Sequence, residues 1–298
     1  MKKWLILFLA VLLFLLPGCG KESTTPQNEK NDQELAIRIL TDFRQDSIGY
    51  RQLEEFAQLL QEKSDNTVAV KLYQRGDWGP ASGFIEYLDM NTVEMVCLQP
   101  PEMNKLQPAY EIFMQPYLFA DLNEAESYVT GEEGEKAMSY LPAKYHGVGL
   151  VTDGYQYLVA AENGGWLDYG DLKWQGQTKS LAGIPVYDLK AVHELDLLLA
   201  KDTWWKELTE EEQEWITDAF RESQKASFSV QREKDFNKGL VSAGILLQGS
   251  DQPEWNSYYA LYLNQRESYF SEHVDKLTQH WRPTAVLPPM TGEETDNK

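Results

Sequence analysis

The sequence predicts an α/β fold with a mostly parallel sheet. Short apolar strand candidates alternate with helical segments from residue 35 to about residue 160. This alternation is typical of parallel strands that are joined by crossover helices. The composition is globular, because 42% of the 298 residues are hydrophobic and 25% are charged. A body of this size comprises one or two domains.

The spacing of apolar residues places the elements in the first half of the chain. Alternating or continuous apolar runs predict strands at residues 35–40, 67–73, 94–98 and 147–151. Apolar residues at helical spacing predict helices at residues 50–63, 84–88, 123–129 and 134–141.

The pattern changes in the second half. Residues 161–178 contain four glycines and show no clear period, so we expect a loop there. Extended segments follow at residues 183–189 and 194–200. Thr209 and Glu212 form a capping box that predicts the start of a long helix. A strand at residues 245–247, a helix carrying Trp255 to Phe270 and a loose tail at residues 283–298 complete the chain.

The N-terminus has the features of an export signal. Lys2 and Lys3 precede an apolar run of 13 residues, which is shorter than the roughly 18 or more that span a bilayer. The run ends before Cys19 in a pattern that resembles a bacterial lipobox, so residues 1–18 are expected to be a lipoprotein signal peptide and Cys19 the lipid attachment site. The alternative is an uncleaved anchor or an ordinary secretory signal. Residues 19–33 are polar and suit a flexible tether, and the protein is expected outside the cytoplasm on the bacterial membrane.

Charge and motif content exclude several classes of function. The 27 basic and 47 acidic residues give a formal net charge of −20, which disfavours nucleic acid as a partner. Two cysteines have no zinc-site spacing, and none of the four histidines lies in a recognised catalytic or metal motif. The sequence therefore predicts no enzyme, no cofactor and no metal.

A ligand pocket is expected beyond the carboxyl ends of the first three strands, because ligands bind there in open α/β sheets. The loops at these ends contain Asp42, Phe43, Trp78 and Gln99, which could line a small-molecule cleft. The alternative is that these residues are ordinary surface loops.

Several stretches, in their order along the chain, resemble the solute-binding proteins of TRAP (tripartite ATP-independent periplasmic) transporters, solute-binding protein family 7. The turn Gly76-Asp77-Trp78-Gly79 is similar to the family's Gly-x-Leu-Gly. Residues 110–119 resemble the family's run ending in Leu-Pro-Tyr-Leu-Phe, and residues 199–213 resemble its strand, Lys-x-x-Trp turn and following helix start.

The resemblance implies a two-lobed, periplasmic-binding-protein-like fold of the type II kind that closes over a small organic solute, usually a carboxylate. It also implies a TRAP membrane permease as the partner. On this basis we expect a solute-binding body at residues 34–282. Its first lobe would comprise about 34–155 with parts of 183–250, and its second lobe about 156–182 with parts of the C-terminal region.

Two departures from the family pattern concern the second lobe. The Lys-x-Arg-Val strand, whose arginine binds the substrate carboxylate in the family, has no counterpart here. The segment at residues 162–175 is also short, because the family has several strands and helices in its place. The second lobe is therefore expected to be truncated. Gln156 stands where many members have a second arginine, so we expect Tyr155 and Gln156 to contact the ligand. Four aromatic residues either roof the pocket or cover an exposed core: Tyr155, Trp166, Tyr169 and Trp174.

The leading hypothesis is an exported, lipid-anchored solute-binding protein of a TRAP transporter. The alternative is a lipoprotein that kept the binding-protein fold and acts as an interaction or sensor module without a transported ligand. An enzyme is the third class, and the sequence assembles no nucleophile, base and orienting group for it.

Overall fold

A computed structural model describes residues 35–161 and 165–272. The expected signal peptide, the tether with Cys19 and the tail at residues 283–298 lie outside these residues. Within the two described ranges, no helix has both the length and the apolar character needed to cross a membrane.

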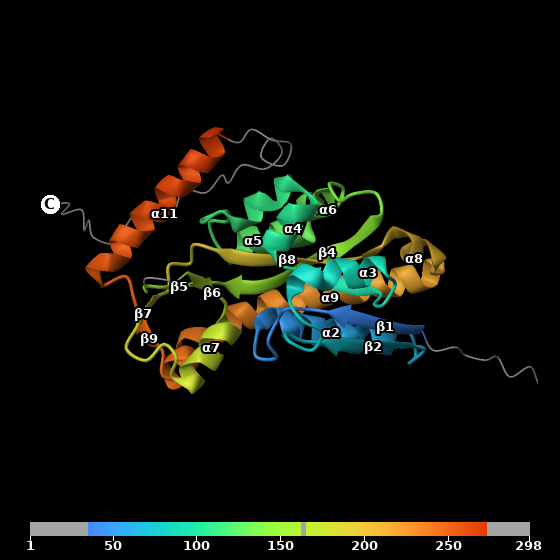
Figure 1. Cartoon of the computed structure of the whole chain (residues 1–298), viewed down its shortest axis with the longest axis horizontal. Coiled ribbons are helices and arrows are strands. Elements are labelled where there is room, and N and C mark those ends of the chain that lie inside the picture. The colour runs from blue at the N-terminus through green and yellow to red at the C-terminus, as the bar shows by residue number, and fades with distance from the viewer. Residues whose placement is uncertain (1–34, 162–164, 273–298) are drawn as a thin grey trace, which may run out of the picture. The chain divides into compact units, whose positions relative to one another are not determined.

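The larger sheet has five strands in the order β2-β1-β3-β8-β4 (Figure 1). Strand β1 pairs in parallel with β2 and with β3, whereas β8 pairs antiparallel with both β3 and β4. Only β8 therefore runs against the other four strands of this sheet. The bounds are Leu35–Leu40 for β1, Val68–Tyr73 for β2, Met95–Leu98 for β3, Tyr145–Tyr155 for β4 and His193–Lys201 for β8.

The smaller sheet has four strands in the order β6-β5-β7-β9. Strand β5 pairs antiparallel with β6 and β7, and β7 pairs in parallel with β9. A single residue, Gln156, separates the end of β4 from the start of β5, so the chain passes directly from one sheet to the other there. The bounds are Tyr157–Val159 for β5, Trp166–Leu167 for β6, Pro185–Tyr187 for β7 and Leu246–Gln248 for β9.

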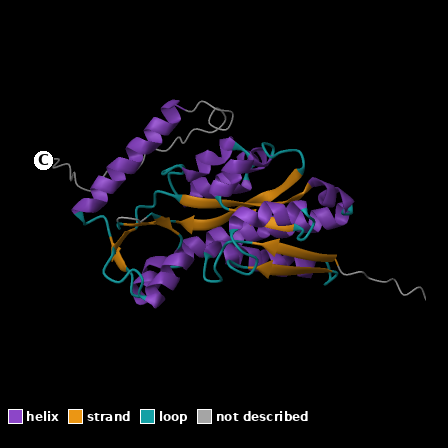
Figure 2. Ribbon diagram, viewed as in Figure 1, coloured by secondary structure: helices purple, strands orange, loops and turns teal. Residues whose placement is uncertain are grey.

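Helices cover both faces of the larger sheet, because successive residues of its strands enter two different cores (Figure 2). In β3, Met95 and Cys97 join the core that includes helices α2 and α9, whereas Val96 and Leu98 join the core beneath helices α3 to α6. The helices are α2 (Ile48–Lys63), η2 (Ala81–Gly83), α3 (Phe84–Asp89), α4 (Pro100–Leu106), η3 (Pro108–Met114), α5 (Leu122–Thr130), α6 (Glu132–Met138), α7 (Tyr169–Thr178), α8 (Asp202–Glu207), α9 (Glu210–Glu233), α10 (Phe236–Ser242) and α11 (Pro253–Glu272).

The predicted capping box is confirmed at the start of α9. The hydroxyl of Thr209 accepts a hydrogen bond from the backbone N–H of Glu212 at 3.2 Å. In return, Glu212 Oε2 accepts from the backbone N–H of Thr209 at 2.7 Å. These bonds satisfy two N–H groups that have no partner within the helix, which is why this helix begins where the sequence indicates.

The loop expected at residues 161–178 is wrong for most of that range, which forms β6 and the ten-residue helix α7. The glycines permit close packing there instead of marking a loop. A Cβ at Gly170 would lie 2.9 Å from the backbone N of Ser47, and one at Gly176 would lie 2.6 Å from the backbone O of Ala243. Because glycine occupies buried positions, the helix lacks the apolar stripe that periodicity detects.

Candidate functional site

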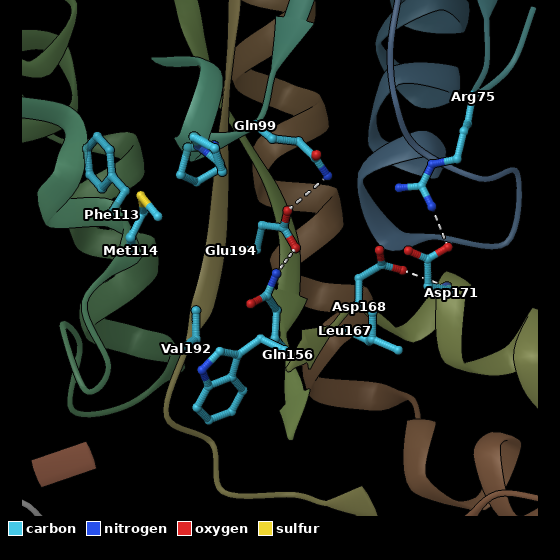
Figure 3. Close-up of a pocket in the computed structure, with 13 residues that line it drawn as sticks. Arg75, Gln99, Phe113, Met114, Gln156, Leu167, Asp168, Asp171, Val192 and Glu194 are labelled. Carbon is cyan, nitrogen blue, oxygen red and sulfur yellow. Dashed lines mark hydrogen bonds and ion pairs between the residues drawn. The ribbon is translucent and has the colours of Figure 1, made fainter. Parts of the chain in front are cut away.

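A cavity of about 350 Å³ lies where the two sheets meet (Figure 3). Its wall includes the segments that follow β2 and β3, which agrees with the rule that ligands bind beyond the carboxyl ends of strands. The remaining wall comes from η3, from the junction of β4 and β5, from β6 with the start of α7, and from β8. The lining residues are Arg75, Gln99, Pro100, Pro101, Phe113, Met114, Gln156, Trp166, Leu167, Asp168, Asp171, Val192 and Glu194.

One side of the cavity is an ion-pair network around Asp171. Its Oδ1 accepts hydrogen bonds from Arg75 Nη1 at 2.5 Å and from Arg44 Nε at 2.6 Å. Arg75 Nε also donates to the backbone oxygen of Asp42 at 2.7 Å. Burial disfavours the charged form of Asp171, but the hydrogen bonds and charges of the two arginines outweigh it and lower the pKa of this carboxyl. Asp171 is therefore ionised and paired.

The other side of the cavity carries Glu194, which is 3% exposed. Its two carboxylate oxygens accept hydrogen bonds from side-chain amides, Oε2 from Gln156 at 2.5 Å and Oε1 from Gln99 at 3.4 Å. Burial raises the pKa of Glu194 to about 8, the charge of Asp168 adds to this shift, and the Gln156 amide opposes it. Glu194 forms no ion pair with the described part of the chain.

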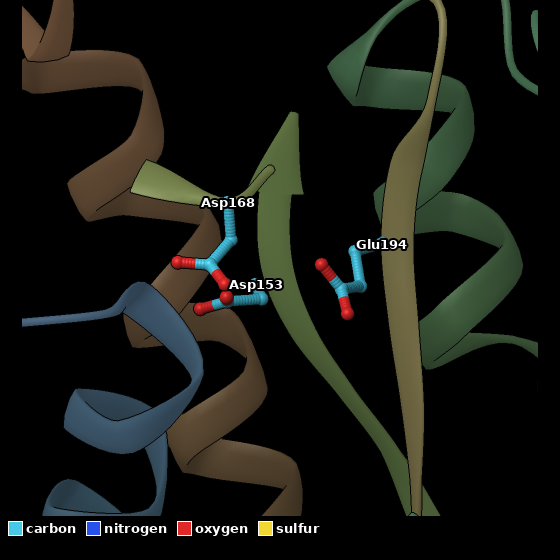
Figure 4. Close-up of side chains that lie close together, drawn as sticks. All are labelled: Asp153, Asp168 and Glu194. Carbon is cyan, nitrogen blue, oxygen red and sulfur yellow. The ribbon is translucent and has the colours of Figure 1, made fainter. Parts of the chain in front are cut away.

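Glu194 belongs to a group of three buried carboxyls with Asp153 and Asp168 (Figure 4). One oxygen from each residue lies within 4.8 Å of the other two, which is close enough to hold a metal ion or another cation. Asp168 is also the N-cap of α7, and its Oδ1 accepts from the backbone N–H of Asp171 at 2.8 Å. Burial, together with the charge of Asp171, raises the pKa of Asp168 to about 6.

The two carboxylate oxygens of Asp153 differ in their hydrogen bonding. Its Oδ1 accepts a hydrogen bond from the backbone N–H of Gly49 at 2.5 Å, whereas Oδ2 is buried and has no hydrogen-bond partner in the described chain. Burial raises the pKa of this carboxyl well above its usual range, and the charges of Asp168 and Glu194 raise it further.

The structure brings some of the expected ligand residues to the cavity and leaves others away from it. Gln99 and Gln156 line the wall, and Asp42 contacts Arg75 without itself lining it. The ring of Phe43 is 1% exposed in the core beside α2. Trp78 packs edge-on between the rings of Tyr73 and Tyr87.

Tyr155 lines a separate cavity of about 220 Å³ together with Lys190, whose Nζ lies 5.2 Å from the centre of the Tyr155 ring. Of the other aromatic residues expected to roof a pocket or cover a core, Trp166 lines the cavity of about 350 Å³ and Tyr169 is buried in the core of the smaller sheet. Trp174 is 45% exposed and lies beneath the Arg44 guanidinium.

Sequence reasoning missed Arg75, Asp168 and Glu194. Arg75 stands in the loop after the second strand, so the strand-end rule includes it, although Trp78 is the residue of this loop that the sequence predicts in the cleft. Glu194 and Asp196 interrupt an apolar strand, and charged residues in such a strand indicate that the sheet carries polar groups inside. Asp168 gave no signal, because the segment around it was interpreted as a loop.

Part of the chain matches a known protein family. Residues 42–163 match the family described as bacterial extracellular solute-binding protein, family 7. The resemblance to family 7 is confirmed. A solute-binding protein of Sulfitobacter sp. (strain NAS-14.1) is 25% identical over 100 residues, a match that spans 33% of this chain and 30% of the relative's own length.

Solved structures of TRAP solute-binding proteins share the two-lobed fold. The protein from Ochrobactrum anthropi, with its C-terminus bound in its ligand-binding pocket, has a TM-score of 0.66 at 18% identity and covers 84% of this chain and 93% of its own. The protein from Desulfovibrio desulfuricans, with bound sn-glycerol-3-phosphate, has a TM-score of 0.69 at 13% identity and covers 83% and 100%. The sugar acid binding protein from Advenella mimigardefordensis, in complex with galactonate, has a TM-score of 0.67 at 18% identity and covers 83% and 96%.

Family 7 is a family of extracellular solute-binding proteins and not a class of enzymes. The expected truncation of the second lobe and the lobe boundaries stay predictions. So does the lipid anchor at Cys19.

Proposed function

We propose that this chain is the lipid-anchored solute-binding protein of a TRAP-type transporter and captures a small organic solute that carries a carboxylate. The observation that carries the proposal is the cavity of about 350 Å³ at the junction of the two sheets. A cavity of this size fits the lower end of small-molecule sites, and its wall combines apolar rings with a few polar groups.

Arg75 is the group proposed to bind the solute carboxylate. It is the only arginine or lysine in the described wall of the cavity. Its Nε and Nη1 donate to Asp42 and Asp171, while Nη2 makes no hydrogen bond to the described residues. A guanidinium that is held in place on one edge presents its remaining donor in a fixed direction. The anionic solutes in the Desulfovibrio and Advenella structures support this chemistry.

Binding is proposed to favour a closed form in which the solute contacts both sheets. Gln99 and Glu194 belong to the larger sheet or its loops, whereas Trp166 and Leu167 form β6 of the smaller sheet. A ligand that contacts both sheets stabilises the arrangement in which they are close, and a membrane permease can recognise that arrangement.

Thermal unfolding of the unlipidated mature protein tests the proposal. Small carboxylates, sugar acids, amino acids and neutral solutes are added in turn. A ligand at about 100 times its dissociation constant stabilises by roughly 2.7 kcal/mol, which raises the unfolding midpoint by a few degrees in a body of this size. A panel without any shift, in a protein that unfolds cooperatively, would favour the interaction or sensor lipoprotein.

The proposed anchor has its own test. Cys19→Ala is expected to abolish the cleaved, membrane-bound mature form in the expressing cells, because no lipid can then be attached at that position. A variant that is still processed and membrane-bound would contradict lipidation at Cys19.

A further inference from the structure

The wall of the cavity contains more acid than base. Arg75 faces three lining carboxyls, Asp168, Asp171 and Glu194. Both Arg75 and Arg44 direct their ion pairs to Asp171, so the positive charge is concentrated on one side. Asp168 and Glu194 form no ion pair within residues 35–161 and 165–272. A simple anionic solute would therefore meet two unpaired carboxyls as well as one arginine.

The three buried carboxyls have the spacing that an ammonium group requires. An ammonium nitrogen carries three donors and lies about 2.8 Å from each charge-assisted acceptor. Three acceptors placed tetrahedrally around it are then about 4.6 Å apart, given that donor distance. One oxygen each from Asp153, Asp168 and Glu194 lies within 4.8 Å of the others.

Asp153 supplies an independent sign of a missing partner. The residue is 1% exposed, and its Oδ2 accepts no hydrogen bond from the described residues, while the Gly49 N–H and the Ser47 side chain act on the carboxyl group as a whole and oppose the rise of its pKa. Figure 4 shows its carboxyl group directed toward that of Asp168, with Glu194 facing the same space from β8. A buried acceptor without a donor costs roughly 1–3 kcal/mol, and a donor brought by a ligand removes that cost.

We propose that the cavity selects a solute with a protonated amine, whose ammonium is bound by Asp153, Asp168 and Glu194 while its carboxylate meets Arg75. The solute is then a zwitterion of the amino-acid type and not a simple hydroxy or sugar acid. Phe113, Met114 and Trp166 provide the apolar wall for its carbon chain. This inference rests on the proposed function, since it names the class of solute for the same cavity.

A bare metal ion fits the same carboxyls less well. Calcium takes six to eight oxygen ligands, and three carboxyls that each offer one oxygen supply at most half of them. Both oxygens of Glu194 already accept hydrogen bonds from Gln99 and Gln156, which disfavours bidentate coordination. An ammonium needs three acceptors, and the cluster offers three.

The test uses solutes that differ only in replacing a hydroxyl by an ammonium. Isothermal titration at pH 8 compares lactate with alanine, malate with aspartate, and 4-hydroxybutyrate with 4-aminobutyrate. At least one amino compound is expected to bind at least ten-fold more tightly than its hydroxy partner. Calcium, magnesium and sodium chlorides are titrated alone in parallel.

Two variants connect that preference to the cluster. Glu194→Gln and Asp153→Asn each remove one acceptor charge with little change of shape, and each is expected to abolish the ten-fold preference. Glu102→Gln is the matched control, because it makes the same charge change on α4 at a side chain that is 19% exposed and whose ion pair among the described residues is with Lys105. Thermal unfolding of each variant shows whether it is folded.

The outcomes separate this inference from the proposed function. Hydroxy acids that bind as tightly as their amino partners would overturn the inference and leave the transport function standing. If a metal salt binds in the absence of any organic solute, and both cluster variants lose that binding, the three carboxyls would be assigned to a metal ion instead. A protein that binds neither amino nor hydroxy acids, nor neutral solutes, would contradict both.

Discussion

Asp168 and Asp171 stand three residues apart at the start of α7, yet their surroundings shift their pKa values in opposite directions. Asp171 accepts hydrogen bonds from two arginines and has a lowered pKa, while Asp168 accepts none from an arginine of the described residues and has a pKa raised to about 6. Asp168 is 7% exposed, and the side chain of Asp171 is 14% exposed. Burial raises the pKa of both carboxyls, and the hydrogen bonds and charges of the two arginines reverse the direction for Asp171 alone.

The largest effect we expect is a loss of stability with rising pH. A carboxyl whose folded pKa is raised stabilises the protein when protonated, and that contribution is lost as pH rises from its unfolded pKa toward its folded pKa. For Glu194 this pH range extends from its usual pKa of 4.5 to its pKa in the folded protein, about 8. One pKa unit corresponds to about 1.4 kcal/mol, so the free energy of unfolding should fall by several kcal/mol, at most about 5, from this group.

Urea unfolding at pH 5, 6.5 and 8 measures this dependence in the wild type and in Glu194→Gln. The variant should unfold at higher urea than the wild type at pH 8 and at about the same urea at pH 5. Asp153 and Asp196 are also buried with raised pKa values, so the stability of Glu194→Gln will still fall somewhat as pH rises. The charges of Arg75 and Asp171 also act on Glu194. Equal slopes in the two proteins would show that Glu194 is not protonated at neutral pH.

The second effect concerns the side of the cavity where Asp171 forms ion pairs with the arginines. Arg75→Ala leaves Asp42 and Asp171 without the guanidinium that contacts both, and the partly buried pair should cost about 2–4 kcal/mol of unfolding free energy. Arg75→Lys keeps the charge but cannot reach both partners at once, so an intermediate loss is expected. Denaturant unfolding at pH 7 gives both values. An unchanged midpoint in Arg75→Ala would mean that Arg44 alone is sufficient to hold Asp171.

The third effect concerns the close contact at Gly170, which positions Asp168 and Asp171. Gly170 lies between them in sequence, and a Cβ there would come within 2.9 Å of the Ser47 backbone nitrogen. Gly170→Ala should shift the start of α7 and cost about 1–3 kcal/mol, because overpacking forces the backbone to move. Gly165→Ala is the control, since a Cβ at that position meets nothing within 4 Å. Similar stability of the two variants, measured by thermal unfolding, would contradict the close contact.

The smallest effect separates the charge of Asp168 from its capping bond. Asp168→Asn keeps the acceptor for the Asp171 backbone N–H and removes an unpaired buried charge, so at pH 8 it should be neutral or stabilising. Asp168→Ala loses the cap and should cost about 1 kcal/mol relative to Asp168→Asn. Thermal unfolding of the two variants gives the difference. A less stable Asn variant would show that the Asp168 charge has a cationic partner in solution.

Local patterns in the sequence were sufficient for most of the elements. The strand β1, the helix α2 and the capping box of α9 were all expected, because apolar spacing and capping residues act over a few positions along the chain. The helix α7 was missed because its glycines are explained by contacts with Ser47 and Ala243, which are distant in sequence.

Local order along the chain is enough to predict the α/β class, a pocket at the strand ends and the resemblance to family 7. Which side chains come together depends on the folded chain. Arg75, Asp168 and Glu194 line the cavity, and Asp153 joins Asp168 and Glu194 in the carboxyl cluster, although the four residues come from four separate segments. Whether a buried acid is ionised depends on neighbours that the fold brings within a few ångströms, and one-dimensional spacing does not contain that information.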